Sequence, residues 1–271
     1  MKTCIIKLSG KISDDSTLLA QLAQGTKALL AAGICPVIVH GGGKQLTQLT
    51  ERLGIVTQIV KGRRITCQDT LAAAQMAFLG LVQPRIVGAL GRCGVVAVGL
   101  SGADGGTVIA IKRAVTSVDY GFVGDIIAVQ TRLLDTLCAA GHVPVVGPLA
   151  VAPDGTLLNV NADTVAAELG LALKATTVVM VSDTPGVMAD RAVPESVLSR
   201  LTLSEAEAMS VNGQAVDGML PKLAAVSRAL KGGIPMVRVV GPEALERLHE
   251  VVTGGVGIGT VITRKVVEAV S

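Results

Sequence analysis

The stretch CPVIVHGGGKQLTQLTERL, residues 35–53, joins an apolar run to a helical pattern through three consecutive glycines. Its first six residues predict a buried strand, and the leucine spacing of 44–53 predicts a helix. Glycine lets the backbone approach an anion closely, with its N–H groups directed at that anion. A tight turn alone is the simpler reading, but three glycines exceed what a turn requires. We therefore expect an anion-binding joint between a strand and a helix.

The same alternation of short apolar runs and helical patterns extends along the whole chain. Further strands are expected at 3–8, 95–100, 107–112, 143–146, 177–182 and 235–240. Further helices are expected at 16–32, 69–92, 131–140, 162–173, 204–209, 217–230 and 242–252. This order, with short glycine-rich joints, predicts right-handed crossovers and an α/β fold: a three-layer α/β/α sandwich with a mainly parallel central sheet.

Two stretches interrupt the alternation with patterns typical of hairpins, at 55–66 and 107–127. The first carries Lys61, Arg63 and Arg64 and is polar enough to form a flap over a site. A soft boundary falls near 148–161, where short strands flank an Asp154-Gly155 turn. We expect a single domain, residues 1–271, with an N-lobe of about 1–155 and a C-lobe of about 156–271 that share one sheet.

Composition argues against several classes of protein. A net charge of +3, one tyrosine, two phenylalanines and no tryptophan leave little with which to bind nucleic acid. No segment has the ~20 unbroken apolar residues of a membrane-spanning helix. The five cysteines form no CxxC pair, which is typical of a reducing cytoplasm, and three scattered histidines make a dedicated metal site improbable.

Two lysines are candidates for binding phosphate. Lys7 ends the first predicted strand, just before Gly10, and Lys222 lies in the opening turn of the helix predicted at 217–230. A buried lysine is costly unless an anion accompanies it, although either lysine could simply lie in solvent. The P-loop pattern GxxxxGK[ST] and the dinucleotide pattern GxGxxG are both absent, so phosphate binding would need other groups.

Polar residues also gather at two other strand ends. Asn159, Asn161 and Asp163 alternate just before a predicted helix. An N-cap explains one of them, and the other two call for a ligand or a hydrogen-bond network. Ser182 and Asp183 end the apolar run 177–181, a position suited to a nucleotide contact but also common at ordinary strand ends.

Taken together, seven motifs resemble those of the amino acid kinase family in collinear order over essentially the whole chain. They are KLSG (7–10), VHGGG (39–43), GRRIT (62–66), VGLSGADG (98–105), NVNAD (159–163), VSDTPG (181–186) and DGMLPK (217–222). The motifs look most like the branch that phosphorylates the γ-carboxylate of N-acetyl-L-glutamate in arginine biosynthesis. Kinases for an aminoadipate derivative or another acidic amino acid, and a non-catalytic ligand-binding regulator, are the alternatives.

The resemblance implies a role for each matching residue. Lys7 and Lys222 would neutralise phosphates on opposite sides of the group transferred from ATP, and Asp163 would hold both lysines in place. Mg²⁺ would be held mainly by the phosphates. Arg64 would clamp the substrate's α-carboxylate. The remaining matches would bind the substrate (Gly42, Gly43, Asn159, Asn161) or the nucleotide (Gly10, Ser182, Asp183, Gly218, Met219).

The chemistry is consistent with these residue types. A γ-carboxylate is already ionised at pH 7, so its phosphorylation needs no strong base. It needs cations and N–H donors that bring two anions together and stabilise the charge of the transition state. The planar guanidinium of Arg64 suits a carboxylate because it can bond both oxygens.

The sequence departs from the family pattern at four positions. Ser9 replaces the first glycine of a pair, Lys44 follows the glycines where proline or cysteine is common, and Arg63 replaces an apolar residue. Val261 stands where relatives often carry arginine. None of these changes removes a residue expected in catalysis.

The resemblance also implies an oligomeric state. Arginine-inhibited relatives carry an additional N-terminal helix that links dimers into a hexamer, and here the first predicted strand begins by Thr3. We therefore expect an arginine-insensitive homodimer whose interface is formed by the helix at 69–92. Its apolar stripe has helical spacing and could instead face the subunit's own core; it comprises Leu71, Ala74, Phe78, Leu81 and Val82.

Overall fold

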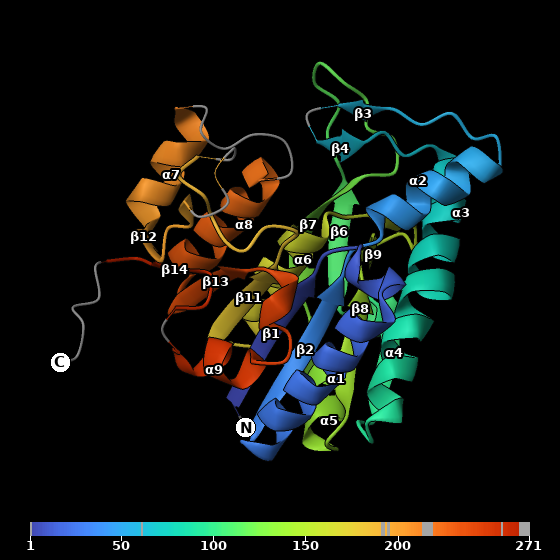
Figure 1. The fold of residues 1–271 in the computed structure, drawn as a ribbon. Helices are drawn as coiled ribbons and strands as arrows, with labels where there is room; N and C mark the ends of the chain where they lie inside the picture. The colour runs from blue at the N-terminus through green and yellow to red at the C-terminus, as the bar shows by residue number, and fades with distance from the viewer. Residues whose placement is uncertain are drawn as a thin grey trace.

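The computed structural model describes residues 2–60, 62–190, 193, 196–212, 219–255 and 257–265. Its centre is an eight-stranded sheet with helices on both faces (Figure 1). The strand order is β12 (Arg200–Thr202), β14 (Thr260–Thr263), β13 (Met236–Val240), β11 (Thr177–Val181), β1 (Lys2–Leu8), β2 (Ile34–His40), β8 (Val143–Gly147), β5 (Ala97–Ser101). Within this sheet, as far as the structure describes it, β13 and β14 are the one antiparallel pair. The expected α/β fold is confirmed.

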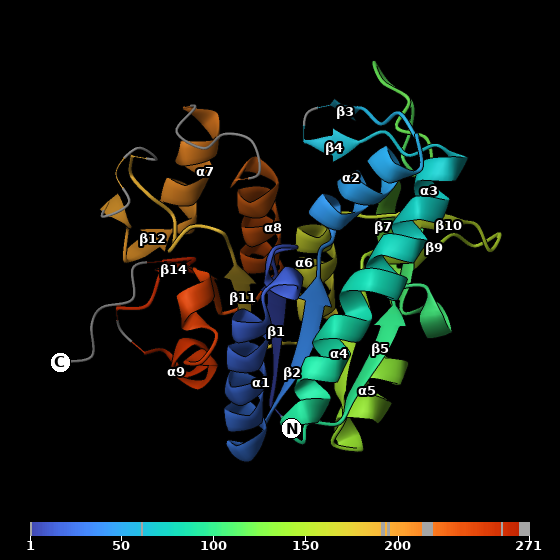
Figure 2. The same ribbon diagram turned by 45° about the vertical axis from the view of Figure 1, so that its right-hand side comes forward.

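The sheet is apolar on both faces because helices cover both. Successive residues of β1 alternate between two cores: Ile5 packs into one, and Cys4 and Ile6 pack into the other. The first core includes residues of α5 (Arg132–Ala139), α6 (Ala162–Ala172) and α8 (Met219–Gly232). The second includes residues of α1 (Ser16–Ala31), α4 (Gln83–Arg92) and α9 (Leu248–Thr253), which lie on one side of the sheet (Figure 2).

Two smaller sheets lie beyond the carboxyl ends of β1 and β2 (Figure 1). The expected hairpins are present: β3 (Ile59–Val60) pairs with β4 (Arg63–Arg64), and β6 (Val108–Lys112) pairs with β7 (Gly124–Val129). The second hairpin belongs to a four-stranded sheet, completed by β9 (Leu149–Val151) and β10 (Leu157–Asn159). These short strands place polar loops above the end of the central sheet.

The helix expected at 69–92 is continuous over Gln68–Arg92 and consists of α3 (Gln68–Gln75), a π-helical segment (Met76–Val82) and α4. By length and composition it could cross a membrane, contrary to the expectation that no segment could. Apolar helices in the cores of water-soluble proteins meet the same criterion, so the indication is weak. Here 44% of the relevant window is buried within the subunit.

The apolar stripe proposed as a dimer interface is mostly internal, and that expectation was wrong. Leu71, Ala74, Phe78 and Val82 are at most 4% exposed, whereas Leu81 is 38% exposed. Helical periodicity correctly found one apolar face, but this face packs on the subunit's own core. Any contact between subunits through this helix would have to use its other face.

Other differences concern the ends of elements. The expected helix at 242–252 is two pieces, a 3₁₀ turn (Pro242–Ala244) and α9. Strands β12 and β14 were not predicted because they have only three and four residues. Helices α2 (Gly43–Arg52) and α7 (Leu203–Val211) are close to the predicted ones, and a capping box between Thr202 and Glu205 fixes the start of α7.

Candidate active site

A cavity of about 510 Å³ opens where β1, β2 and β11 end, as expected for ligand sites in parallel sheets. Its walls contain every predicted site residue that the structure describes. These residues are Lys7, Gly10, Gly42, Gly43, Arg64, Asn159, Asn161, Asp163, Ser182, Asp183, Met219 and Lys222. Gly218, the remaining candidate, lies outside the described residues. Residues far apart in the sequence thus line one cavity, although their individual roles stay predictions.

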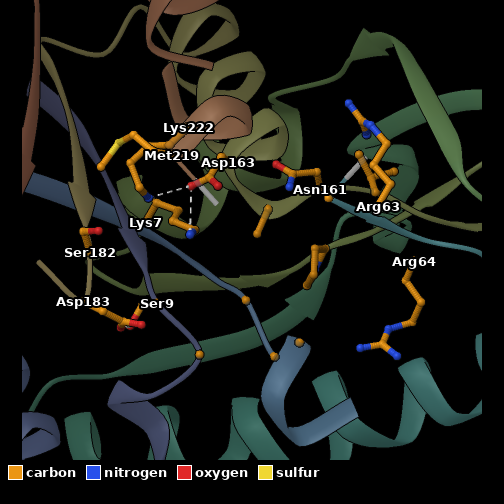
Figure 3. A pocket seen from close by; sticks show the side chains of 18 of the residues that line it. Lys7, Ser9, Arg63, Arg64, Asn161, Asp163, Ser182, Asp183, Met219 and Lys222 are labelled. Carbon is orange, nitrogen blue, oxygen red and sulfur yellow. Dashed lines mark hydrogen bonds and ion pairs between the residues drawn. The ribbon is translucent and has the colours of Figure 1, made fainter. Parts of the chain in front are cut away.

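Two lysines share one carboxylate at the base of this cavity (Figure 3). Lys7 Nζ lies 2.8 Å from Asp163 Oδ1, and Lys222 Nζ lies 3.5 Å from the same oxygen. All three residues are less than 9% exposed. The folded chain therefore buries two ammonium groups against a single carboxylate, which attracts a further anion to the cavity.

The ionisation of this group follows from burial and charge. Burial raises the pKa of Asp163, but the charges and hydrogen bonds of Lys7 and Lys222 outweigh it, so this pKa lies below its ordinary value. The pKa of Lys222 is lowered, first by burial and then by the charge of Lys7, against the opposing effect of Asp163. A bound phosphate would supply the missing negative charge.

The two glycine turns after β1 and β2 approach each other closely. A Cβ atom placed on Gly10 would come within 3.5 Å of the Gly42 nitrogen. A Cβ atom on Gly42 would clash with the Phe78 ring at 2.5 Å. Gly43 begins α2, so the cavity also receives the N-terminus of a ten-residue helix. Backbone N–H groups and a helix N-terminus together form an anion-binding surface.

The departures Ser9 and Lys44 have clear structural partners. Lys44 Nζ lies 3.0 Å from Asp14 Oδ2, so its charge is neutralised outside the cavity lining. Ser9 Oγ donates to Asp183 Oδ1 over 2.9 Å. Ser9 itself lines the cavity, whereas Lys44 does not.

Arg64 lies across the cavity from the two lysines (Figure 3). Its Nη1 donates to Thr57 Oγ1 over 2.7 Å, and its Nη2 donates to Thr47 Oγ1 over 2.6 Å. Burial lowers the pKa of Arg64 from its ordinary value, against the opposing charge of Glu51. The two threonine hydroxyls orient the guanidinium without neutralising it, so it can bind an anionic group.

Thr47 and Thr57 were not identified from the sequence. Thr47 lies four residues after Gly43 in α2 and therefore on the same face, a spacing that could have revealed it. Thr57 lies in a loop and gave no such signal. Arg63, the neighbour of Arg64, extends in a different direction (Figure 3).

Asn159 and Asn161 have different structural roles. Asn161 is the N-cap of α6, where its Oδ1 accepts from the Thr164 N–H over 3.0 Å, so the capping interpretation is confirmed. Its amide group remains in the cavity wall. Asn159 ends β10 and donates to Thr66 Oγ1 over 3.2 Å. Both asparagines line the cavity that also contains Arg64 and the two lysines.

Over the part of the chain that the structure describes, no group of three histidine, cysteine, aspartate or glutamate side chains could hold a metal ion. Among the described residues, the carboxylates that line the cavity are those of Asp163 and Asp183. Both are already paired with lysines. A divalent cation in this site would therefore depend on ligands other than a cage of protein carboxylates.

The family model of the amino acid kinase family matches residues 2–240, and this chain belongs to that family. An acetylglutamate kinase from Symbiobacterium thermophilum is 39% identical over 269 residues, which cover 97% of this chain and 92% of that protein. An acetylglutamate kinase from Prochlorococcus marinus is 39% identical over 261 residues, covering 95% of this chain and 83% of that protein.

A solved structure with a similar fold is N-acetylglutamate synthase from Neisseria gonorrhoeae, complexed with coenzyme A and N-acetyl-glutamate. Its TM-score is 0.85, and the likeness covers 98% of this chain and 60% of that chain. At 23% identity this likeness supports the fold alone.

Proposed function

We propose that this protein is an ATP-dependent kinase that converts N-acetyl-L-glutamate into N-acetyl-L-glutamyl 5-phosphate, a step of arginine biosynthesis. The observation that carries the proposal is the buried Lys7–Asp163–Lys222 group beside two glycine turns, with Arg64 across the same cavity. The names of the two relatives at 39% identity support the choice of substrate within the family.

The reaction places two anions in contact, and the cavity has cations for both. Lys7 and Lys222 would bind the phosphate oxygens on either side of the transferred group, while Asp163 keeps the two ammonium groups in place. The N–H groups of Gly10, Gly42 and Gly43 would bind charge that develops during transfer. Because these donors are fixed before the reaction, little reorganisation is needed in the transition state.

The acceptor is a carboxylate that attacks in its ionised form, so no residue has to remove a proton. Arg64 would bind the α-carboxylate of the substrate through both nitrogens, with Asn159 near the acetamido group. Fixing that end directs the γ-carboxylate toward the lysines at the other side of the cavity. Positioning of this kind is a large part of catalysis when no covalent chemistry is required of the protein.

Mg²⁺ would neutralise charge on the phosphates of ATP when bound. The cavity fits an ion held mainly by phosphate oxygens, because the carboxylates of Asp163 and Asp183 are already engaged by lysines. Each of them could contribute through a water molecule without leaving its lysine partner. Their paired state is consistent with the expectation that Mg²⁺ arrives with the nucleotide.

A coupled assay of ADP release, with ATP and Mg²⁺, tests the proposal on N-acetyl-L-glutamate, L-glutamate and N-acetyl-L-aminoadipate. We expect turnover with the first compound and little with the other two. Preferred turnover of the aminoadipate derivative would reassign the substrate. No turnover with any of them, together with measurable binding, would favour the ligand-binding regulator.

We also propose that the protein acts in the cytoplasm as a homodimer, without nucleic-acid or membrane partners. Since Leu71, Ala74, Phe78 and Val82 are internal, the face with Met76, 55% exposed, and Leu81 is the part of the helix available to a second subunit. Light scattering of the purified protein measures its mass directly. A monomeric mass would remove the dimer from the proposal.

A further inference from the structure

His40 is a buried histidine directly behind the glycine turn. It ends β2, is 1% exposed, and is not part of the cavity wall. Its Nδ1 lies 2.8 Å from the carbonyl oxygen of Gly41. A carbonyl oxygen can only accept, so Nδ1 carries the proton and donates. Burial lowers the pKa of His40 to about 4, so the ring is neutral near pH 7.

The hydrogen bond from His40 fixes the direction of a peptide group. In a planar trans peptide, the C=O of Gly41 and the N–H of Gly42 point in opposite directions. The Gly41 N–H also donates to the Leu8 carbonyl over 3.3 Å, so Gly41 is held on both sides. Glycine peptides rotate easily. Holding this carbonyl therefore selects one orientation of the Gly42 N–H.

The selected orientation leaves the Gly42 N–H open to an anion. With its carbonyl partner turned to His40, the Gly42 N–H is directed away from the core. The Gly42 nitrogen lies beside the Gly10 turn, since a Cβ on Gly10 would approach it to 3.5 Å. In the described part of the chain, no backbone acceptor is recorded for this N–H. It is therefore available to an anion between the two turns.

We propose that His40 is a positioning residue, whose Nδ1–H holds the Gly41 carbonyl so that the Gly42 N–H remains directed at the transferred phosphate. The inference rests on the proposed kinase function, because it specifies how one donor of that site is oriented. His40 itself does not reach the substrates. It acts through the peptide group that joins Gly41 and Gly42.

The surroundings of the ring are unusual for a residue that only fills space. His40 Nε2 is buried and, within the described residues, has no hydrogen-bond partner. An unpartnered buried nitrogen costs stability that a leucine would not. The sheet also leaves room for the ring at Gly147, where a Cβ would lie 3.4 Å from Nε2. The histidine is thus retained at a cost, and its Nδ1 hydrogen bond is the contact that a leucine cannot make.

Three variants distinguish a positioning role of His40 from a role in packing alone. His40→Leu keeps an apolar volume but removes the donor, whereas His40→Asn keeps an N–H donor near the position of Nδ1. Ile38→Ala is the matched control, because Ile38 lies two residues before His40 on the same face of β2 and is fully buried. Thermal melts would establish that all three variants are folded at the assay temperature.

We expect His40→Leu to lower kcat by about 10- to 100-fold, as when one fixed donor is misplaced, with KM for N-acetyl-L-glutamate changed less than about threefold. His40→Asn should recover most of the lost kcat, and Ile38→Ala should lose stability with little change in kcat. Wild-type kcat in His40→Leu, or an equal loss in His40→Asn, would overturn the inference. An equal loss in Ile38→Ala would also overturn it, by assigning the effect to packing.

A second measurement does not depend on turnover. Calorimetry with a nonhydrolysable ATP analogue and Mg²⁺ should show affinity about tenfold weaker in His40→Leu than in the wild type or His40→Asn, a loss typical of one charge-assisted hydrogen bond. If the wild type turns over none of the substrates tested, the proposed function fails, while this binding difference still tests His40. Equal affinity in all three proteins would exclude His40 from orienting a phosphate-binding group.

Discussion

The hydroxyl of Ser9 donates a hydrogen bond to Oδ1 of Asp183 over 2.9 Å. The two residues are 174 positions apart, but β1 and β11 are parallel neighbours, so the turns that follow them meet. Lys11 Nζ lies 2.8 Å from the other oxygen of the same carboxylate. Burial raises the pKa of Asp183, yet the bonds from Lys11 and Ser9 lower it below its ordinary value. A glycine at position 9 could not make this link between the two turns.

Replacing Ser9 with glycine should weaken nucleotide binding. The change removes one solvent-exposed hydrogen bond, a loss of about 1 kcal/mol, and frees both turns. We expect KM for ATP to rise about two- to tenfold, with KM for the amino acid unchanged. Steady-state kinetics with each substrate varied in turn measures both values. A KM for ATP equal to that of the wild type would mean that the hydrogen bond from Ser9 to Asp183 does not contribute to nucleotide binding.

Each buried lysine should matter more for the reaction than for folding. Lys7→Ala and Lys222→Ala each remove a cation that meets the transferred phosphate, and deletion of a comparable donor costs about 3–4 kcal/mol in the transition state. We expect kcat to fall about 100- to 1000-fold in each variant. Kinetics combined with circular dichroism measures the two effects separately. An unchanged kcat in either variant would exclude that lysine from the mechanism.

Removing one of the two lysines and removing the carboxylate that they share should have opposite effects on stability. Lys222→Met leaves the 2.8 Å pair of Lys7 and Asp163 intact and removes a buried charge whose pKa is already lowered. We expect its melting temperature to equal or exceed that of the wild type. A gain of about 1 kcal/mol in the free energy of unfolding would correspond to a rise of about 2–4 °C. Asp163→Asn leaves two buried ammonium groups without an anion and should cost about 3–5 kcal/mol. Calorimetric melts compare the three proteins, and a larger loss in Lys222→Met would contradict this assignment.

Much of the fold could be predicted because it depends on local patterns. The continuous apolar runs that became β1, β2, β8 and β11 are the sequence signature of a parallel sheet buried on both faces. The joint at 41–43 correctly predicted a strand, a glycine turn and a helix. Short strands such as β12 and β14 have no comparable signal, because three or four residues cannot establish a period.

The site was partly predictable for a different reason. Lys7, Asp163 and Lys222 each end a strand or begin a helix, and a parallel sheet brings such positions to one edge. Sequence could not reveal that two lysines use the same oxygen of Asp163. Nor could it distinguish a stripe that faces the core from one that faces a partner, since Leu71 and Phe78 have the same spacing in either case.

Arg64 should determine affinity for the acidic substrate. Arg64→Lys keeps a positive charge but loses the planar fork and at least one of the bonds to Thr47 and Thr57. We expect KM for N-acetyl-L-glutamate to rise at least about tenfold, the loss expected when two charge-assisted bonds become one, while KM for ATP stays near wild type. The reverse pattern, with ATP binding weakened alone, would place Arg64 on the nucleotide side.

The contribution of the Lys7–Asp163–Lys222 group to the stability of the protein should decrease at low pH. The pKa of Asp163 is lower in the folded protein than its ordinary value of 3.8, because the charges of Lys7 and Lys222 outweigh burial. The unfolded chain therefore binds a proton first as the pH falls, and the stabilisation is fully present above about pH 4 to 5. It is lost as the pH falls through the folded pKa, when the carboxyl group becomes neutral in both states.

Melts of wild type and Asp163→Asn between pH 3 and pH 7 isolate this effect, since other carboxylates with lowered pKa values, such as Asp14 and Asp183, titrate in both proteins. We expect the difference in melting temperature to be constant from about pH 5 to pH 7 and to shrink below about pH 4, because protonated aspartate and asparagine are both neutral there. A difference that grows toward low pH would mean that the folded state raises, rather than lowers, the pKa of Asp163. In that case burial, and not the two lysines, would control the charge of the carboxylate on which the site is built.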